Sequence, residues 1–535
     1  MRRLLLASAA LFLTACGDDD GTPDPVVDAG PEPQDTRPPP VDAGLVFDDP
    51  AYASLCDPAA DPGEYPAPDS WTERGPGGPA VTFEEAAVFE TCAYLDGGEL
   101  DISDHHNLVT MYDGYLLMPW APEYGAGGFT FWDFSDPCTP VVHGTGASMT
   151  MRESHSIGFS HLGGAWAVVD QLNGYLERGA GGIQFWDLSD TSAPTHAADF
   201  DLPGFVYPDA YARVSLSVFW QAPFVYVGAA DNGVYIVDAT DPTDARLVGQ
   251  YAWDPTLRVG QVQVVGNLLI ATETEGPRTA LLDVSDPLDP QPIPGGDFQA
   301  MDATGEPRGA YFTNFVGGRI HYANKDSGGG ILIYDVSDPE NPRYVGERLS
   351  DGNGGYVFVK DELAFVGESR FAAIYDLSDP EAITEVTRLD LEGDLDTITP
   401  IGNVAVLSVD DDAIEDQGSS VIPVAMEVDT RAPHVAFVWP ADGATGVRTS
   451  GRVGVSFSEM VAVKSAFEGS VRLYETESGR RVPGTVSAQE TLVNFHPFCA
   501  LEPGTDYTLE IPAGGVADFN GNAVTETFTA TFTTE

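Results

Sequence analysis

Basic residues are scarce in this 535-residue chain, which has 25 Lys and Arg against 83 Asp and Glu and a formal net charge of −58 at pH 7. Nucleic acid would be repelled by that field, so the charge argues against a nucleic-acid partner. A cation, or an anion held in a locally basic pocket, remains compatible with the composition.

Long hydrophobic and helical segments are missing as well. Beyond Cys16 no apolar run is long enough to form a membrane-spanning helix, and no long segment places apolar residues at the helical period. Turn formers are frequent instead, with 58 Gly and 41 Pro. The chain is therefore predicted to be all-β, with many tight turns and little helix.

Several enzyme signatures are absent from the sequence: the Gly-x-Ser-x-Gly elbow, His-Glu-x-x-His, the phosphate-binding P-loop and the dinucleotide fingerprint. Their absence favours a binding role over catalysis. It leaves open a reaction at a site of another kind.

The N-terminus carries an export signal. Residues 1–16 combine two arginines, a short apolar run and small residues before Cys16, which is typical of a signal peptide. Leu13 to Cys16 resembles the bacterial lipobox, which implies a lipid on Cys16; an ordinary signal peptide is the alternative. Gly17 stands where that family's inner-membrane retention signal has Asp, which favours the outer membrane or cell surface. Residues 17–47, rich in Asp, Pro and Gly, predict a disordered tether to the bilayer.

Four further cysteines, Cys56, Cys92, Cys138 and Cys499, form an even set that predicts disulfides in an exported chain. Three complete pairings are possible. We favour Cys56–Cys92, because both residues precede the repeats described next. The pair Cys92–Cys138 would instead tie the entry strand to the first repeat.

A motif recurs along most of the chain and is clearest at Gly330 to Pro339 (GILIYDVSDP), where an apolar run and an aspartate end in a Ser-Asp-Pro turn. The spacing of its aspartates matches the length of a four-stranded propeller blade, about 40–50 residues. We predict a seven-bladed β-propeller over residues 104–432, with six blades as the alternative. Residues 48–103 would lead into it and supply a ring-closing strand. The repeat aspartates are Asp133, Asp187, Asp238, Asp283, Asp335 and Asp376, with a worn copy at Asp429.

These repeats resemble the LVIVD repeat family of bacterial surface propellers over roughly residues 104–430. The resemblance implies a β-propeller at the cell surface, and that family has no settled activity. The repeated aspartates suggest metal ligands at first sight. We expect a turn role instead, because Asp and Ser side chains accept backbone N–H groups in turns and Pro ends strand pairing.

Residues 433–535 lack the repeat and have the length of one small β-sandwich. Their landmarks, from Val435 through Leu492 to Thr533, resemble the bacterial Ig-like domain of S-layer and other surface proteins. The Asp518 to Asn522 loop offers oxygen atoms that suit calcium, but no bidentate Glu stands at a suitable distance, so we expect a hairpin turn there.

The first strands of propeller blades line the central channel, and their starts meet at one mouth. Arginines there would suit a carboxylate or phosphate, and histidines with Asp104 or Glu153 would suit Zn²⁺ or another divalent ion. Ordinary rim residues paired with acids are the alternative. The predicted ligand-binding residues are His106, His155, Arg213, Arg258 and Arg308; the predicted metal ligands are His105, His106 and His155.

The sequence therefore predicts a lipid-anchored surface protein whose propeller binds or scaffolds a partner, such as an envelope protein or glycan. The alternative is a metal-dependent hydrolase or lyase that acts on an anionic substrate at the mouth. A divalent metal, Zn or Ca, is the only cofactor that the residues suggest.

Overall fold

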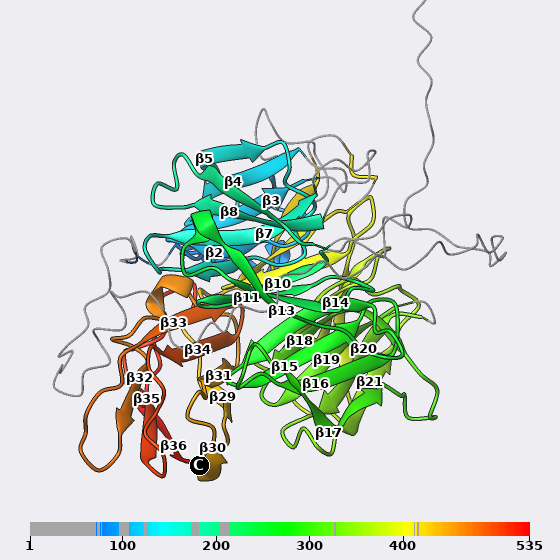
Figure 1. Cartoon of the computed structure of the whole chain (residues 1–535). Coiled ribbons are helices and arrows are strands. Elements are labelled where there is room, and N and C mark those ends of the chain that lie inside the picture. The colour runs from blue at the N-terminus through cyan, green and yellow to red at the C-terminus, as the bar shows by residue number, and fades with distance from the viewer. Residues whose placement is uncertain are drawn as a thin grey trace, which may run out of the picture. The chain divides into compact units, whose positions relative to one another are not determined.

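The computed structural model describes residues 71, 75, 77–95, 106–121, 126–172, 181–203, 215–325, 328–410, 412–414 and 417–535. Nearly all regular structure in these ranges is β-strand (Figure 1). The named helical elements are the 3₁₀ turns η3 (Glu85–Ala87), η6 (Pro242–Asp244) and η7 (Val463–Ser465). The all-β prediction is confirmed. Across the described part of the chain, no helix is both long enough and apolar enough to cross a membrane.

Seven four-stranded antiparallel sheets precede the C-terminal region in the described residues, which is the architecture of a β-propeller, as predicted. In chain order the strands are β2 (Thr110–Tyr112), β3 (Tyr115–Trp120), β4 (Gly127–Asp133) and β5 (Val141–Ser148); β6 (Gly158–Ser160), β7 (Trp166–Leu172), β8 (Gly181–Asp187) and β9 (Thr195–Asp201); β10 (Ser217–Gln221), β11 (Phe224–Gly228), β12 (Val234–Asp238) and β13 (Arg246–Tyr251); β14 (Val259–Val265), β15 (Leu268–Glu273), β16 (Arg278–Asp283) and β17 (Gln291–Gln299); β18 (Gly309–Val316), β19 (Arg319–Lys325), β20 (Gly330–Asp335) and β21 (Arg343–Leu349); β22 (Val357–Lys360), β23 (Leu363–Gly367), β24 (Ala372–Asp376) and β25 (Thr384–Leu389); and β26 (Thr397–Ile401), β27 (Val404–Ser408), β28 (Ser419–Pro423) and β1 (Ala93–Leu95).

The strand sequences explain their positions within each blade. The first strands of neighbouring blades contact one another and so form the inner ring, for example β14 with β18 and β18 with β22. Third strands such as β12 (VYIVD) are buried throughout, because sheets pack on both of their faces. Fourth strands such as β25 (TEVTRL) alternate exposed and covered residues, as expected for the outer edge of a blade.

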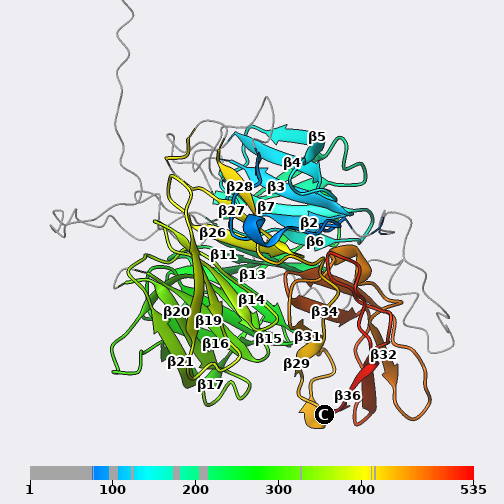
Figure 2. The ribbon, with the colours of Figure 1, turned by 180° about the vertical axis from the view of Figure 1, so that it is seen from behind.

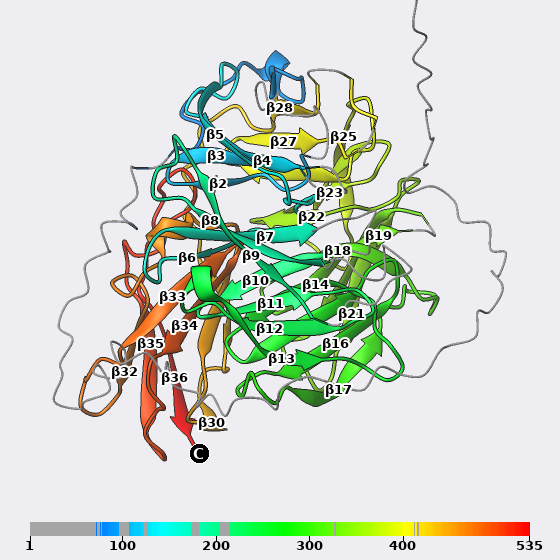
Figure 3. The same cartoon turned by 45° about the horizontal axis from the view of Figure 1, so that its top comes forward.

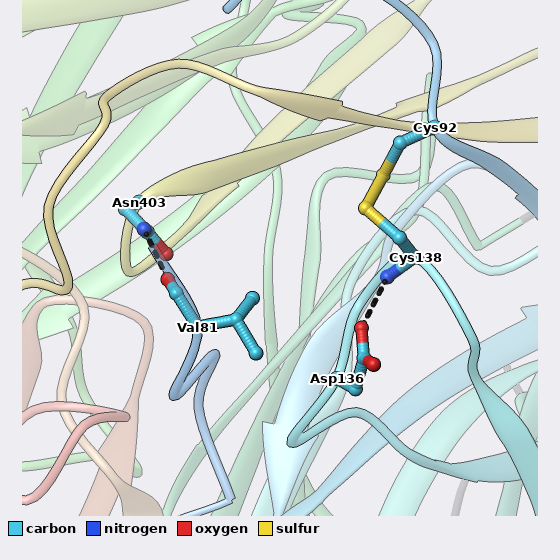
Figure 4. Close-up of a disulfide and its surroundings, with 5 residues drawn as sticks. All are labelled: Val81, Cys92, Asp136, Cys138 and Asn403. Carbon is cyan, nitrogen blue, oxygen red and sulfur yellow. Dashed lines mark hydrogen bonds between the residues drawn. A yellow bond between two sulfur atoms is a disulfide. The ribbon is translucent and has the colours of Figure 1, made fainter. Parts of the chain in front are cut away.

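The N-terminal strand completes the last blade. β1 pairs antiparallel with β28, with Ala93 opposite Val421 and Leu95 opposite Ser419 (Figure 2). Just before β1, Cys92 forms a disulfide with Cys138 in the turn after β4 (Figure 4). The favoured pairing of Cys56 with Cys92 is therefore wrong: β1 joins the seventh blade beside the first, and this register brings Cys92 to Cys138. Cys499 is also disulfide-bonded.

The repeat aspartates stabilise turns. Oδ1 of Asp335 accepts the backbone N–H of Ser337 at 2.9 Å, and Oδ1 of Asp376 accepts that of Ser378 at the same distance. Each motif carboxylate makes the equivalent bond to the residue two positions later, so this hydrogen bond fixes the exit from every third strand that carries the motif. The same bond is made by Asp133, Asp187, Asp238 and Asp283.

The C-terminal region is the predicted Ig-like β-sandwich. One sheet has the strand order β29-β31-β34-β33 and the other β30-β36-β35-β32, in which β30 runs parallel to β36. The strands are β29 (Val435–Trp439), β30 (Ala444–Val447), β31 (Val453–Phe457), β32 (Arg472–Glu475), β33 (Gly484–Gln489), β34 (Leu492–Pro497), β35 (Asp506–Ile511) and β36 (Phe528–Thr534). Apolar side chains between the sheets, including Phe457, Phe495 and Tyr507, form its core.

This Ig-like domain covers one end of the propeller ring, where the first strands end and turn into the second strands; β33 lies beside β6 and β10 (Figure 3). It contacts that turn in blade after blade. Examples are the ion pair Lys464–Asp113 at 3.2 Å and the hydrogen bond between Nε2 of His161 and Oε1 of Glu468 at 2.7 Å. Further contacts reach Gln221, Gly266, Gly317 and Asp361 of blades three to six, and Asn520 lines one small cavity with Gly402 of blade seven.

The β33–β34 hairpin makes the central contacts of this covered end. Gln489 accepts from the N–H of Trp220 at 3.2 Å and donates to the carbonyl of Val218 at 2.9 Å, both in β10. The carboxylate of Glu490 accepts from Gln263 in β14 and Asn314 in β18 at 3.3 and 3.1 Å. The hairpin thus bonds three successive first strands, and the other mouth of the channel is the one where those strands begin.

Candidate functional site at the mouth of the channel

Buried polar side chains converge where the first strands begin. They come from the segments that lead into β2, β6, β22 and β26, from the strands β7 and β19, and from the segment after β27. We call this set the mouth cluster: Asn107, Arg152, Glu153, His155, Asp170, Lys325, Tyr356, Asp396 and Asp410. All but Asp410 are buried, which is unusual for so many polar groups.

His155 stands between two carboxylates. Its Nε2 lies 3.3 Å from Oε1 of Glu153, and its Nδ1 lies 3.9 Å from Oδ2 of Asp170. The backbone N–H of His155 also donates to Oδ2 of Asp170 at 3.3 Å. The imidazole therefore has a carboxylate near each of its two nitrogens.

Asp170 interrupts an otherwise apolar strand, Ala167-Val168-Val169-Asp170, and is fully buried. Burial raises its pKa to about 6, although His155 and Arg152 nearby favour the ionised form. This carboxyl group therefore changes its protonation state close to neutral pH.

Asn107 links three blades at the mouth. Its side-chain amide donates to Oε1 of Glu153 from the second blade and to Oδ1 of Asp410 from the seventh, the latter at 3.2 Å. The bonds place two carboxylates on one amide group. The mouth cluster is thus one connected network rather than a set of separate rim residues.

Aromatic rings form one side of the cluster. The His155 ring stacks on Phe312 with 5.2 Å between centroids, and Phe312 stacks on Tyr356 at 4.2 Å. Nζ of Lys325 lies 4.1 Å from the ring centre of Tyr311, a cation–π contact. Burial raises the pKa of Asp396 well above its usual range, and Lys325 opposes that shift.

Several fully covered atoms of this region have no hydrogen-bond partner in the described structure. They include Oδ1 of Asp170, Oη of Tyr356 and both amide atoms of Asn324. Buried polar groups are nearly always hydrogen-bonded, to protein, to ordered water or to a ligand. Such atoms also occur elsewhere in the described chain, but those of Asp170 and Tyr356 belong to the connected network at this mouth.

The residues predicted from the sequence separate into two groups. His155 lies in the mouth cluster. His106, which is buried beside Asn107, forms a hydrogen bond between its Nδ1 and Oγ of Ser419 at 2.9 Å. Arg258 instead pairs with Asp231 at 3.1 Å, and Arg308 pairs with Asp302 at 2.6 Å. Each of these arginines thus has an acidic partner, as expected for ordinary rim residues. Arg213 and His105 lie outside the described residues.

The cluster also contains residues that the sequence analysis did not select, among them Asp170, Lys325, Tyr356 and Asp396. The described cluster contains four carboxyl groups, those of Glu153, Asp170, Asp396 and Asp410, beside the basic side chains of Arg152, His155 and Lys325, whereas the prediction concentrated on basic residues. Two of the missed residues lie on second strands, whereas the prediction considered only the starts of first strands. Asp170 could have been found from the sequence, because a charged residue that follows a run of apolar strand residues often belongs to a functional site.

One group of side chains is close enough together to share a metal ion, and it does not include the predicted histidines. In the described ranges, only Asp429, Glu459 and Asp518 bring three ligand atoms of His, Cys, Asp or Glu within 4.8 Å of one another. This group lies at the end of the ring that the Ig-like domain covers. The predicted set that includes His105 falls partly outside the described residues and stays a prediction.

Comparisons with known proteins match two parts of the chain. Residues 219–252, which span β10 to β13, match the LVIVD repeat, and residues 429–534 match a bacterial Ig-like domain. The chain therefore carries both of the units that its motifs resemble. No curated protein matches it.

Several solved structures are similar to the chain, and their sequence identity to it is low. A β-propeller domain from Myceliophteria thermophila is 12% identical with a TM-score of 0.45, covering 60% of this chain and 97% of that one. The Pseudomonas aeruginosa periplasmic gluconolactonase is 11% identical with a TM-score of 0.44, covering 60% and 88%. BamB from Moraxella catarrhalis is 14% identical with a TM-score of 0.33, covering 59% and 81%. The chain's own sheets, rather than these likenesses, establish the fold.

Proposed function

We propose that this chain is an exported bacterial envelope protein whose propeller binds a partner at the mouth cluster. The observation that carries the proposal is the buried polar network at the end of the ring that the Ig-like domain leaves uncovered. The Ig-like domain covers the other end, with Asn494 and Glu490 bonded to the strand ends. At the uncovered end, Asn107 joins Glu153 and Asp410, and His155 lies between Glu153 and Asp170.

The export signal and the tether supply the location. A lipid on Cys16 would hold the chain at the outer membrane or cell surface, and residues 17–47 would separate the folded part from the bilayer. The bacterial Ig-like domain fits such a setting. Replacing Cys16 by Ser should move the protein from the membrane fraction to the soluble fraction, and retention in the membrane would contradict the lipid anchor.

The partner is expected to be a glycan or protein of the envelope. The acidic mouth offers carboxylate acceptors for hydroxyl and amine donors, and the net charge of −58 disfavours nucleic acid. Two exposed residues at the two ends of β5 allow a matched test of which end of the ring the partner contacts. Met149 is 82% exposed and follows β5 on the connection to the mouth segment at Arg152, whereas Val141 is 63% exposed at the opposite end of the same strand.

A photo-cross-linking amino acid at position 149 or 141, incorporated in living cells, separates the two ends of the ring. We expect a product from position 149 and none from position 141. Asp170→Asn, or Tyr356→Phe if the first variant is unstable, should abolish that product. Digestion with a muramidase or a protease then assigns the partner to glycan or protein. Equal products from both positions, or none from position 149, would contradict binding at the mouth.

A metal-dependent hydrolase or lyase is the second candidate, and the position of His155 between Glu153 and Asp170 favours it. Such a trio can move a proton near neutral pH, because the pKa of Asp170 is about 6. Elemental analysis of the wild type and of His106→Ala/His155→Ala tests it. A stoichiometric transition metal that disappears in the double variant would favour the enzyme, and no metal in either protein would favour binding alone.

A further inference from the structure

A second group of carboxylates lies at the covered end of the ring, away from the mouth cluster. Asp429 comes from the segment between the propeller and β29, Glu459 follows β31, and Asp518 lies in the loop between β35 and β36. One oxygen from each lies within 4.8 Å of the others. We call these three residues, with Asn520 of the same loop, the seam site.

Lys360, the last residue of β22, already contacts two of these carboxylates. Its Nζ lies 2.5 Å from Oδ2 of Asp429 and 2.7 Å from Oε2 of Glu459. Asp361 is a fourth carboxylate, 3.7 Å from the same ammonium group, and it pairs with Arg431 at 3.1 Å. Four carboxylates therefore face two basic side chains, and one divalent cation would offset the remaining charge.

A small cavity lies beside Lys360. Its volume is about 10 Å³, enough for one water molecule or one ion, and Asp429, Glu459, Asp518 and Asn520 line it. Lys360 uses only one oxygen of Glu459. The other, Oε1, has no hydrogen-bond partner in the described structure, although Glu459 is only 3% exposed. Oδ1 of Asn520 is likewise covered and without a partner there.

The geometry points to a calcium site in this cavity, formed by carboxylate oxygens of Asp429, Glu459 and Asp518 and by the amide oxygen of Asn520. Calcium takes six to eight oxygen ligands and tolerates irregular arrangements, so water would complete its shell. The Asp518 loop is already ordered for this purpose. Oδ1 of Asp518 accepts the N–H groups of Asn520 and Asn522 at 2.9 and 2.8 Å, which fixes the direction of the carboxylate.

The carboxyl groups at the seam are poorly compensated without an ion. Glu459 and Asp518 are each only 3% exposed, and buried carboxylates require a compensating positive charge. A divalent cation would supply it. It would also join the segment at Asp429, which leads out of the propeller, to two parts of the Ig-like domain, so calcium should strengthen the attachment of that domain.

The alternative is that the ammonium group of Lys360 is the resident cation and that the cavity holds water. Calcium titration of the full chain, purified in detergent and treated with chelator, separates the two cases by calorimetry and thermal unfolding at physiological ionic strength. We expect saturable uptake of one Ca²⁺ and a rise in melting temperature. Both should be lost in Glu459→Gln and Asp518→Asn and kept in Glu510→Gln, a matched acid of the same domain that pairs with Arg472 at 3.2 Å.

Lys360→Met provides the decisive comparison, because the ammonium group competes with calcium for the same oxygens. The site predicts that this variant binds Ca²⁺ at least as well as the wild type. Asn520→Leu, which leaves every charge in place, should weaken uptake and covers the case in which an acid variant fails to fold. If neither the wild type nor Lys360→Met shows saturable uptake, the calcium site is wrong. Uptake that Asn520→Leu and Glu459→Gln leave unchanged would equally overturn it.

Discussion

Asn494 of the Ig-like domain bonds the propeller as if it were part of a blade. Its Oδ1 accepts from the N–H of Gly266 at 2.7 Å, and its Nδ2 donates to the carbonyl of Val264 at 2.9 Å. Gln221 of the neighbouring blade donates to the same Oδ1 at 3.0 Å. One amide side chain thus forms hydrogen bonds with groups from two blades. The Ig-like domain is therefore packed against the end of the ring and not only linked to it through the chain.

Replacing Asn494 by Ala should therefore destabilise the whole folded unit. Three buried hydrogen bonds are lost, and two backbone groups are left without partners, which costs about 3 kcal/mol in the free energy of unfolding. Urea denaturation measures this change. Asn341→Ala is the matched control, because Asn341 is exposed and its side chain bonds Asp338 at the surface, so it should cost less than about 0.5 kcal/mol. Equal losses in the two variants would contradict the role of Asn494.

The propeller was predictable because its information is local. The motif at Asp335 repeats an apolar strand with a turn whose hydrogen bonds run between residues two apart. The Cys92–Cys138 bond was one of the pairings that the sequence allowed, but it was not the one selected, because the choice depends on where β1 places Cys92 relative to the turn after β4. The contacts of Asn494 were hidden for a similar reason: its partners are mostly backbone atoms of another domain, and backbone atoms leave no trace in a sequence pattern.

The candidate site was predictable only in part. Histidines precede the first strands of two blades, and this pattern led to the selection of His155. The carboxylate of Glu153, two residues earlier, lies 3.3 Å from its Nε2. Asp170 and Lys325 belong to second strands, which reach the mouth because an antiparallel neighbour ends where the first strand begins. The charge of the mouth could not be inferred from the starts of first strands alone, since the second strands supply part of it.

The hairpin that carries Glu490 predicts a pH dependence of stability. Burial raises the pKa of Glu490 to about 7, whereas a Glu in the unfolded chain titrates near about 4.3. Between these values the folded protein binds more protons than the unfolded chain, so the contribution of this group to stability falls as pH rises. Glu490→Gln keeps the acceptor for Asn314 and removes the titration.

Melting temperatures at pH 5 and pH 8 test this prediction. Relative to the wild type, Glu490→Gln should gain stability at pH 8 and gain little at pH 5. Glu475→Gln is the control, because a hydrogen bond from Ser478 lowers the pKa of Glu475 and leaves it ionised across that range. The same shift at both pH values for Glu490→Gln would show that Glu490 does not titrate in this window.

The disulfide next to β1 should contribute strongly to ring closure. Cys92 and Cys138 are 46 residues apart, and closing a loop of that length restricts the unfolded chain by about 4 kcal/mol in the chain-entropy model. The double variant Cys92→Ser/Cys138→Ser should therefore lose roughly 2–4 kcal/mol of unfolding free energy. Urea denaturation of the oxidised protein measures it. An unchanged midpoint would mean that β1 adds little to the last blade.

Two tyrosines provide a test of whether the mouth is built for binding or for stability. Oη of Tyr334 accepts from the N–H of Met301 at 2.7 Å and donates to its carbonyl at 2.9 Å, whereas Oη of Tyr356 at the mouth has no partner in the described structure. Both rings are nearly buried. Tyr334→Phe should cost about 1 kcal/mol or more, because it strands two backbone groups, and Tyr356→Phe should cost almost nothing.

The Tyr356→Phe variant should nevertheless lose the cross-linked product from position 149, since Tyr356 belongs to the mouth cluster that we propose as the binding site. Thermal unfolding and cross-linking measured on the same preparation separate these effects. A hydroxyl group kept for stability would lower the melting temperature when removed, and one kept for binding would not. If Tyr356→Phe lowers the melting temperature as much as Tyr334→Phe and leaves the product intact, the mouth cluster is a structural network and the binding site lies elsewhere on the propeller.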